Sequence, residues 1–161
     1  ADRARAMGAD LPTDWIDEIY AEIYAALREG VDVIDGIPPL LDQLDAAGIG
    51  YCVASNGSQT KMDITLGLTG LAPRFQGRRW SAHELGVAKP DPGLFLHAAA
   101  AAGAAPASCV VIEDSASGAE AARRAGMRCL GYARHGPDPR LSRQGATLIG
   151  HMDEVAGHLG L

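Results

Sequence analysis

The sequence lacks any run of lysine and arginine, any apolar stretch as long as a membrane span, and the apolar core of a signal peptide. The formal net charge is -6, so nothing provides the basic surface that binding to a nucleic-acid backbone requires. A membrane helix needs about 20 consecutive apolar residues, and a secretory signal needs an apolar segment near the N-terminus. We therefore expect no nucleic-acid partner and no membrane insertion.

Cysteine and histidine are too scattered for a disulfide framework or a zinc site. The three cysteines, Cys52, Cys109 and Cys129, contain no C-x-x-C pair. An odd number of separated thiols is typical of buried cysteines in a reducing compartment, so we expect a cytoplasmic protein. The five histidines share no spacing typical of metal ligands. Oligomeric state leaves no trace in the sequence, and a monomer is the default expectation.

The first third of the chain predicts two helices separated by a connector. Hydrophobic residues make up 47% of the 161 residues, which is enough for one core and a small appendage. An amphipathic helix is expected at 13–29 and a second helix from Pro38 to Gly48, because proline is favoured in the first helical turn. We place a domain boundary in the connector, so that residues 1–35 and 36–161 belong to different domains.

Strands and helices alternate in the second domain. Apolar runs predict strands at 51–55, 109–113 and 128–132, and helical patterns predict helices at 92–102, 118–125 and 151–159. Residues 58–70 fit both patterns, and we expect a helix there. Ser117 and Glu120 have the spacing of a capping box. Strands without polar alternation, each followed by a helix, predict an α/β fold with a doubly wound parallel sheet.

Two polar segments lie at or near strand ends, where open parallel sheets bind ligands. In A-S-N-G-S, Ser55 ends an expected strand, and the amides of Asn56 and Gly57 can face an anion. The same residues are also common in simple turns. In A-K-P-D-P, the chain places Lys89, one of only two lysines. Its ammonium can neutralise a phosphate, although a solvated surface lysine is an equal alternative.

A third segment, V-V-I-E-D-S-A-S-G, places two adjacent carboxylates, Glu113 and Asp114, at the end of an apolar strand. Carboxylates there repel each other and lose hydration, which costs stability unless a cation joins them. A divalent ion removes that penalty, and oxygen ligands beside a phosphate favour Mg²⁺. Helix capping by Asp114 is the alternative, but it leaves Glu113 unexplained. We therefore expect a magnesium site at these two acids.

Together the three segments resemble the motifs of the haloacid dehalogenase-like superfamily, in its phosphatase and β-phosphoglucomutase-like branch with a helical cap. S-N-G at 55–57 matches the second motif, Lys89 the third, and I-E-D-S-A-S-G at 112–118 the fourth. The resemblance covers nearly the whole chain. It implies a Rossmann-like core over 36–161 and the C-terminal part of a helical cap domain over 1–35.

The resemblance also implies roles for individual residues. Ser55 and Lys89 would act in catalysis, and both would bind substrate together with the backbone amides of Asn56 and Gly57. Asp114 would hold Mg²⁺, with Glu113 beside it. The implied reaction is the magnesium-dependent hydrolysis of a small phosphate ester, sugar phosphates by analogy, through an aspartyl-phosphate intermediate.

The family's first motif, an Asp-x-Asp that ends the first strand, has no counterpart in these 161 residues. In the family, that strand lies centrally, between the strands that here end at Ser55 and Glu113. We therefore expect the chain to be the C-terminal part of a longer protein that carries the nucleophile, and we expect the 161 residues alone to be inactive.

Two other functions remain open. A phosphosugar mutase of the same family differs in cap residues that are partly absent here. A non-catalytic module that binds an anion or a partner would fit a chain without a nucleophile. A nucleotide-binding fold ranks last, because no G-x-x-x-x-G-K-[ST] or G-x-G-x-x-G motif is present.

Overall fold

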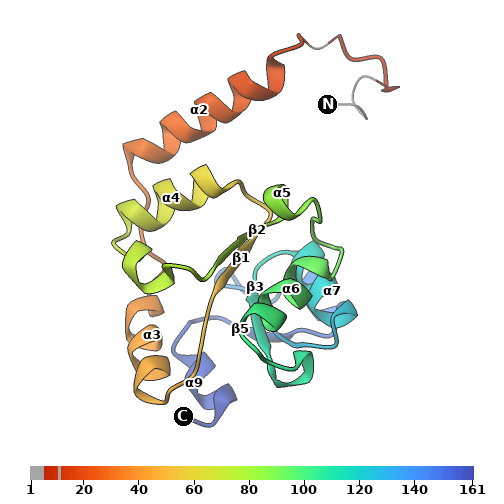
Figure 1. Ribbon diagram of the computed structural model, residues 1–161. Helices are drawn as coiled ribbons and strands as arrows, with labels where there is room; N and C mark the ends of the chain where they lie inside the picture. Colours follow the sequence, from red (N-terminus) through yellow and green to blue (C-terminus); the bar gives the residue numbers. More distant parts are fainter. Residues whose placement is uncertain (1–5, 11) are drawn as a thin grey trace.

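A computed structural model describes residues 6–10 and 12–161 as short strands surrounded by helices (Figure 1). The α-helices are Trp15–Glu29 (α2), Ile37–Ala46 (α3), Gln59–Leu68 (α4), Ala82–Leu85 (α5), Gly93–Ala101 (α6), Ala116–Arg124 (α7), Pro139–Ser142 (α8) and Glu154–Leu159 (α9). The strands are Val53–Ser55 (β1), Arg79–Ser81 (β2), Val110–Glu113 (β3), Arg128–Tyr132 (β4) and Thr147–Ile149 (β5). Two 3-10 helices cover Ala72–Phe75 and Pro106–Ser108.

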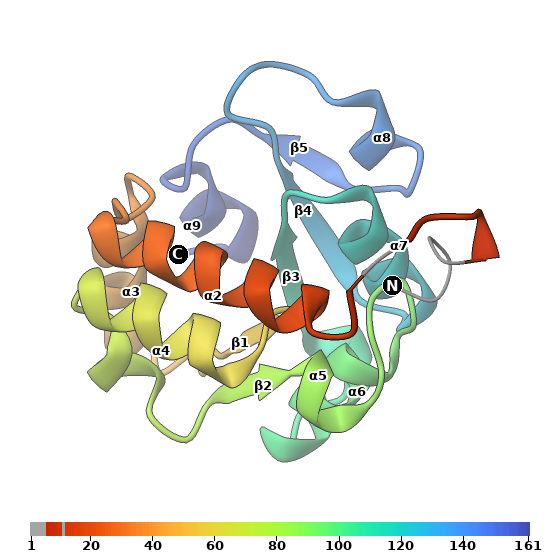
Figure 2. The same cartoon turned by 90° about the horizontal axis from the view of Figure 1, so that it is seen from above.

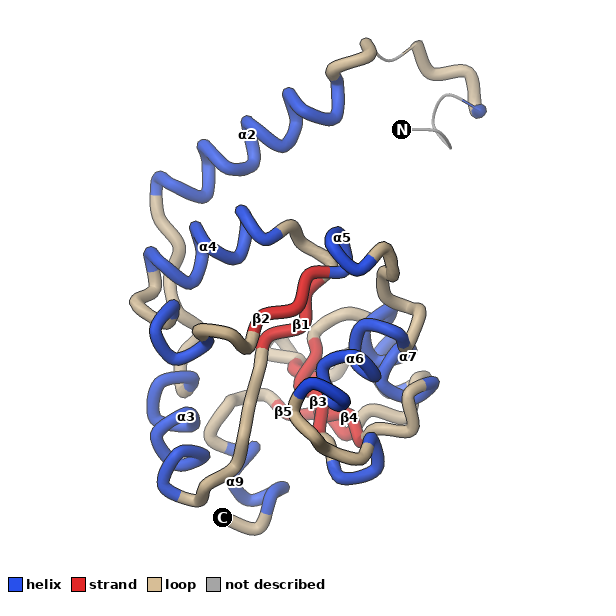
Figure 3. The backbone as a smooth tube through the Cα atoms, viewed as in Figure 1, coloured by secondary structure: helices blue, strands red, loops and turns tan. Residues whose placement is uncertain are grey.

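The strands form two parallel sheets at the centre of the molecule (Figure 3). One sheet pairs β1 with β2, and the other has the order β3-β4-β5. Ser55 lies opposite Ser81 in the first sheet, and Glu113 lies opposite Gly131 in the second. Within the described residues, no strand ladder joins β1 to β3.

Helices cover both faces of the three-stranded sheet. Successive residues of a strand point to opposite faces. Val111 and Cys129 accordingly belong to an apolar cluster with α6 and α7, while Leu130 and Ile149 belong to a second cluster with α3 and α9. Figure 2 shows α3 and α9 on one side of the strands and α6 and α7 on the other. The doubly wound α/β fold predicted from the sequence is therefore confirmed.

The three strands expected from apolar runs are all present, and residues 59–68 of the ambiguous stretch form a helix. The sequence did not reveal β2, β5, α5 or α8, each of which is only three or four residues long. The capping box was wrong. Ser115, not Ser117, is the N-cap of α7, and its hydroxyl oxygen accepts the N–H of Gly118 at 3.0 Å. Glu120 instead pairs with Arg124 one turn later.

The predicted amphipathic helix at 13–29 is α2, and no residue of this helix is buried. Figure 1 shows it lying above α4, apart from the strands. Two aromatic residues attach it to the rest of the chain. Tyr24 shares a hydrogen bond with the Ser58 hydroxyl, and the ring of Tyr20 meets the ring of His83 edge-on at 6.2 Å.

The connector between α2 and α3 turns at Gly36. This glycine has a φ of +82°, in the left-handed region that residues with a side chain avoid. A Cβ at this position would also lie 2.9 Å from the Cβ of Met152. Both constraints require glycine here, so the connector passes close against the segment before α9.

The three cysteines differ in burial. All three cysteines are free, and Cys129 is buried, whereas Cys109 is partly exposed and Cys52 is exposed. The expectation of buried thiols therefore holds for Cys129 alone. Among the described residues, no helix combines the length and the apolar character needed to cross a membrane.

Candidate active site

The three polar segments predicted to converge are joined by side-chain contacts. Ser55 ends β1, Glu113 ends β3, and Lys89 lies in the loop between α5 and α6. The Asn56 Oδ1 atom accepts the backbone N–H of Lys89 at 2.9 Å, and Asn56 Nδ2 donates to the Lys89 carbonyl at 3.3 Å. The Lys89 ammonium in turn reaches Glu113 Oε2 at 2.7 Å. One chain of polar contacts therefore connects the ends of the two sheets.

Glu113 is neutralised by lysine. Its side chain is 8% exposed and that of Lys89 is 11% exposed, so this is a buried ion pair. The Glu113 Oε1 atom also accepts the Ser115 hydroxyl and the Asp114 N–H, both at 3.2 Å. A charge out of water is tolerated when it is paired and hydrogen-bonded. Lys89 supplies a compensating charge for Glu113, so burial of this carboxylate does not by itself require a metal, and a metal-binding role for Glu113 stays a prediction.

Close packing fixes the Glu113 carboxylate on the first turn of α7. The carboxylate lies against the Cα atom of Gly118, and a Cβ at that position would overlap it. On the other side, the Lys89 ammonium lies 5.0 Å from the centre of the Phe95 ring, within the range of a cation–π interaction. Burial raises the pKa of the nearby Cys129 thiol to about 11, and the negative charge of Glu113 adds to that shift.

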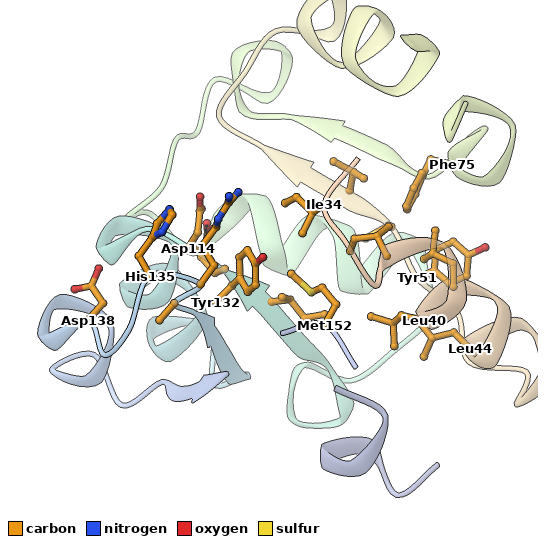
Figure 4. Close-up of a pocket in the computed structure, with 18 of the residues that line it drawn as sticks. Ile34, Leu40, Leu44, Tyr51, Phe75, Asp114, Tyr132, His135, Asp138 and Met152 are labelled. Atoms are coloured by element: carbon orange, nitrogen blue, oxygen red, sulfur yellow. Dashed lines mark hydrogen bonds between the residues drawn. The ribbon is translucent and has the colours of Figure 1, made fainter. Parts of the chain in front are cut away.

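Asp114 has a different environment from its neighbour. It is exposed at the end of β3 and lines a cavity of about 710 Å³. Figure 4 shows its side chain beside His135 at one end of this cavity, with Leu40 and Leu44 at the other end. Capping does not occupy Asp114, because Ser115 is the N-cap of α7.

The same cavity is lined by two further acids, Glu113 and Asp138. Hydrogen bonds from Arg140 lower the pKa of the Asp138 carboxyl, and Glu113 is held by Lys89. Among the described residues that line the cavity, Asp114 is thus the acid whose carboxylate has no ion pair or hydrogen bond.

Asp114 fits a magnesium site with few protein ligands. No group of three or more His, Cys, Asp and Glu residues suited to a metal occurs in the described part of the chain. Mg²⁺ typically keeps several waters and takes only one or two carboxylates from a protein. The exposed Asp114 carboxylate, which lines the cavity, provides such a ligand, whereas Glu113 is already paired with Lys89.

The loop after β1 holds the Ser55 hydroxyl in a defined orientation. The Ser55 Oγ atom accepts the N–H of Gly57 at 3.0 Å. The hydroxyl proton can therefore be donated outward. The Gly57 amide donates to Ser55 in this structure, and its role as an anion donor stays a prediction. The backbone amide of Asn56 remains a predicted anion donor, although the side chain of Asn56 binds Lys89.

Sequence reasoning missed one residue that supports this loop. Ser81 ends β2, is buried, and donates its hydroxyl proton to the Gly57 carbonyl at 2.8 Å. The same Oγ atom accepts the N–H of His83 at the start of α5. The segment R-R-W-S carries no apolar run that would have predicted a strand, so its position beside the loop was not visible in the sequence.

Comparison with known proteins gives consistent matches. The 6-phosphogluconate phosphatase of Escherichia coli (strain K12) is 26% identical over 149 residues, which cover 92% of this chain and 66% of that protein. A conserved haloacid dehalogenase-like protein of Agrobacterium tumefaciens has a solved structure with a TM-score of 0.83 and 33% identity, over 94% of this chain and 70% of that chain. A HAD family hydrolase from Deinococcus radiodurans, solved with bound phosphate and sodium, has a TM-score of 0.79 and 30% identity, over 98% and 71%.

These relatives are longer than the chain, which spans only about two thirds of the curated phosphatase. The family model for haloacid dehalogenase-like hydrolases matches residues 2–126, well over half of the 161 residues. The model match agrees with the solved structures and with the predicted motifs at 55–57, Lys89 and 112–118. The chain belongs to the haloacid dehalogenase-like hydrolase family.

Proposed function

We propose that the protein containing this chain is a magnesium-dependent phosphatase that acts on small phosphorylated metabolites. The observation that carries the proposal is the contact chain from Asn56 through Lys89 to Glu113, next to the free carboxylate of Asp114. These contacts join the loop that carries the Ser55 hydroxyl to the Lys89 ammonium and the Glu113 carboxylate, at the ends of two sheets. Phosphoryl transfer depends chiefly on such positioning and on charge neutralisation.

Each side chain has a role that its contacts support. Ser55 donates its hydroxyl proton to a phosphoryl oxygen, because its Oγ atom is already held by Gly57. Lys89 lowers the cost of bringing negative groups together, and Glu113 keeps its ammonium in place. The backbone amide of Asn56 adds a further donor at the start of the loop.

Asp114 is the residue that would hold Mg²⁺, with Glu113 beside it as the partner of Lys89. The ion would offset the negative charge of the phosphate oxygens. Asp114 suits this role because its carboxylate is exposed, lines the cavity and has no ion pair within the described part of the chain.

The nucleophilic aspartate lies, in this proposal, on a strand outside residues 1–161 that fills the cavity between β1 and β3. Cys52 and Val53 line the cavity on the side of β1, and Ile112 lines it on the side of β3. Ile112 is 38% exposed, which is unusual for an apolar residue in the middle of a strand. A strand inserted there would pair with both open edges and cover this side chain. The aspartate would form the aspartyl-phosphate intermediate that water then hydrolyses.

We further propose that residues 1–35 belong to a helical cap above this site, joined to the core over 36–161 at Gly36. The exposed apolar residues of α2 support this division, because a helix with an apolar face needs a partner. Sugar phosphates are the proposed substrate class, supported by the likeness to a 6-phosphogluconate phosphatase, and the cytoplasm is the proposed location.

The test is an assay of phosphate release by the longer protein against a panel of sugar phosphates, with Mg²⁺ and after chelation. We expect release that requires Mg²⁺ and that falls strongly in Asp114→Asn, while the 161-residue chain alone releases none. Transfer of phosphate between positions of one sugar, without release, would identify a mutase instead. Release that is insensitive to chelation would refute the magnesium role of Asp114.

A further inference from the structure

Asn56 follows β1 directly, and its side chain contacts a loop 33 residues away in sequence. We infer that Asn56 is a positioning residue, whose carboxamide holds the backbone of Lys89 and thereby keeps the Lys89 ammonium on Glu113. The effect on catalysis rests on the proposed function, whereas the structural effect on Lys89 does not.

The two hydrogen bonds match the carboxamide group specifically. The Oδ1 atom accepts the Lys89 N–H at 2.9 Å, while the Nδ2 atom donates to the carbonyl of the same residue at 3.3 Å. Asparagine offers a donor and an acceptor on one short side chain. Aspartate keeps only the acceptor, alanine keeps neither, and glutamine is one methylene longer.

The segment that carries Lys89 has few other supports. It lies between α5 and α6, and the next residue, Pro90, has no N–H to donate. A backbone hydrogen bond that closes this loop runs from the Asp91 N–H to the Ala88 carbonyl and does not involve Lys89 itself. Asn56 therefore supplies the hydrogen bonds of the Lys89 peptide groups within the described chain.

The two hydrogen bonds between Asn56 and Lys89 also link the ends of the two sheets. β1 and β3 share no ladder in the described residues, so side chains must set the distance between their ends. Asn56 extends from the end of β1, and Lys89 reaches the end of β3. Without the carboxamide, the loop can move away and withdraw the ammonium from the buried carboxylate.

Lysine labelling measures this movement directly in the 161-residue chain. The sequence contains only two lysines, Lys61 and Lys89, so peptide mass spectrometry separates their rates of reductive methylation. Lys61 is exposed and serves as an internal reference, while the Lys89 side chain is 11% exposed. Cys129 is buried, and its reaction with a thiol reagent reports any general loosening of the core.

We expect Asn56→Ala to raise the labelling rate of Lys89 about fivefold to tenfold, in keeping with the loss of two modest hydrogen bonds. Lys61 labelling and Cys129 protection should stay unchanged. Asn56→Asp keeps the acceptor for the Lys89 N–H and should give an intermediate rate. Gln59→Ala, which removes an exposed side-chain hydrogen bond to Asp63, is the matched control and should label like the wild type.

Two results would overturn the inference. One is a Lys89 rate in Asn56→Ala that equals the wild-type rate. The other is a rise in Lys89 labelling accompanied by an equal rise in Cys129 reactivity, because that pattern reports general unfolding. An Asn56→Asp variant that labels as fast as Asn56→Ala would refute the contribution of the Lys89 N–H bond.

The same variants in the longer protein test the link to catalysis. We expect Asn56→Ala to lower kcat about tenfold with less than about a twofold change in KM, because Lys89 acts on charge that develops in the reaction. Partial recovery of kcat in Asn56→Asp would match the labelling order. A labelling change in a protein that releases no phosphate would retain the positioning role and refute the proposed function.

Discussion

The two sheets differ in how far each is supported by its own core. The three-stranded sheet has apolar clusters on both faces, and Leu130 and Ile149 in it are almost fully buried. In the two-stranded sheet, all three residues of β1 are only partly buried. The candidate site lies where these two regions meet. Its geometry therefore depends on polar side chains that cross between them, in addition to the packing of Val53 and Ala54 against the two apolar clusters.

The largest expected effect comes from removing the carboxylate of the buried Lys89–Glu113 ion pair. Glu113→Gln leaves the Lys89 ammonium in a poorly hydrated place without its counter-charge, and removal of one partner of a buried pair typically costs about 3–5 kcal/mol. We expect a loss in that range in the free energy of unfolding, measured by urea denaturation.

Glu120→Gln is the matched control, because its carboxylate pairs with Arg124 on the surface of α7. Exposed helix pairs contribute about 0.3–0.5 kcal/mol, so this variant should be nearly neutral. Equal losses in the two variants would contradict the buried character of the Lys89–Glu113 pair.

A pair of core substitutions compares the two sheets directly. Leu130→Ala removes a buried side chain from β4 and should cost about 2–5 kcal/mol. Val53→Ala removes a partly buried side chain from β1 and should cost about 1 kcal/mol, since a fully buried CH₂ group contributes about 0.8 kcal/mol. Thermal unfolding monitored by circular dichroism ranks the two variants, and a larger loss from Val53→Ala would reverse the comparison.

The cap of α7 gives a smaller effect. Ser115→Ala removes the hydroxyl that accepts the Gly118 N–H and that donates to Glu113. Loss of an N-cap serine typically costs about 1 kcal/mol, which chemical denaturation resolves. Ser117→Ala should change stability by less, because Ser117 does not cap the helix. The opposite order would restore the capping box that the structure excludes.

The smallest effect concerns pH and the carboxyl of Glu154 at the start of α9. Hydrogen bonds from the Gly150 and His151 amides lower the pKa of the Glu154 carboxyl below its usual range. A carboxyl with a lowered pKa stabilises the fold above its unfolded pKa, and that contribution is lost as pH falls through the folded pKa. We expect Glu154→Gln to have a lower Tm than the wild type at pH 7, and the difference to shrink in acid. Glu22→Gln, on the exposed surface of α2, should follow the wild type throughout.

The sequence predicted the features that depend on local pattern. The apolar runs around Val111 and Cys129 identified β3 and β4. The three motif segments meet as expected, because Lys89 contacts both Glu113 and Asn56, the neighbour of Ser55. Short strands without an apolar run escaped detection, because β2 consists of Arg79, Trp80 and Ser81.

The hydrogen-bond partners were beyond sequence reasoning for a different reason. The bond between Asn56 and Lys89 links loops that are distant in the chain, and nothing in either loop identifies the other. For Glu113, the sequence correctly indicated that a positive partner was needed. It did not show that this partner would be the Lys89 ammonium.

The hydroxyl bond between Tyr24 and Ser58 has a mechanical consequence for the proposed site. Ser58 is three residues from Ser55, and its oxygen also accepts the Lys61 N–H at the start of α4. A rotation of α2 must therefore either break this bond or pull directly on the loop that carries Ser55. The orientation of α2 is thereby coupled, through one hydrogen bond, to the loop that positions the Ser55 hydroxyl.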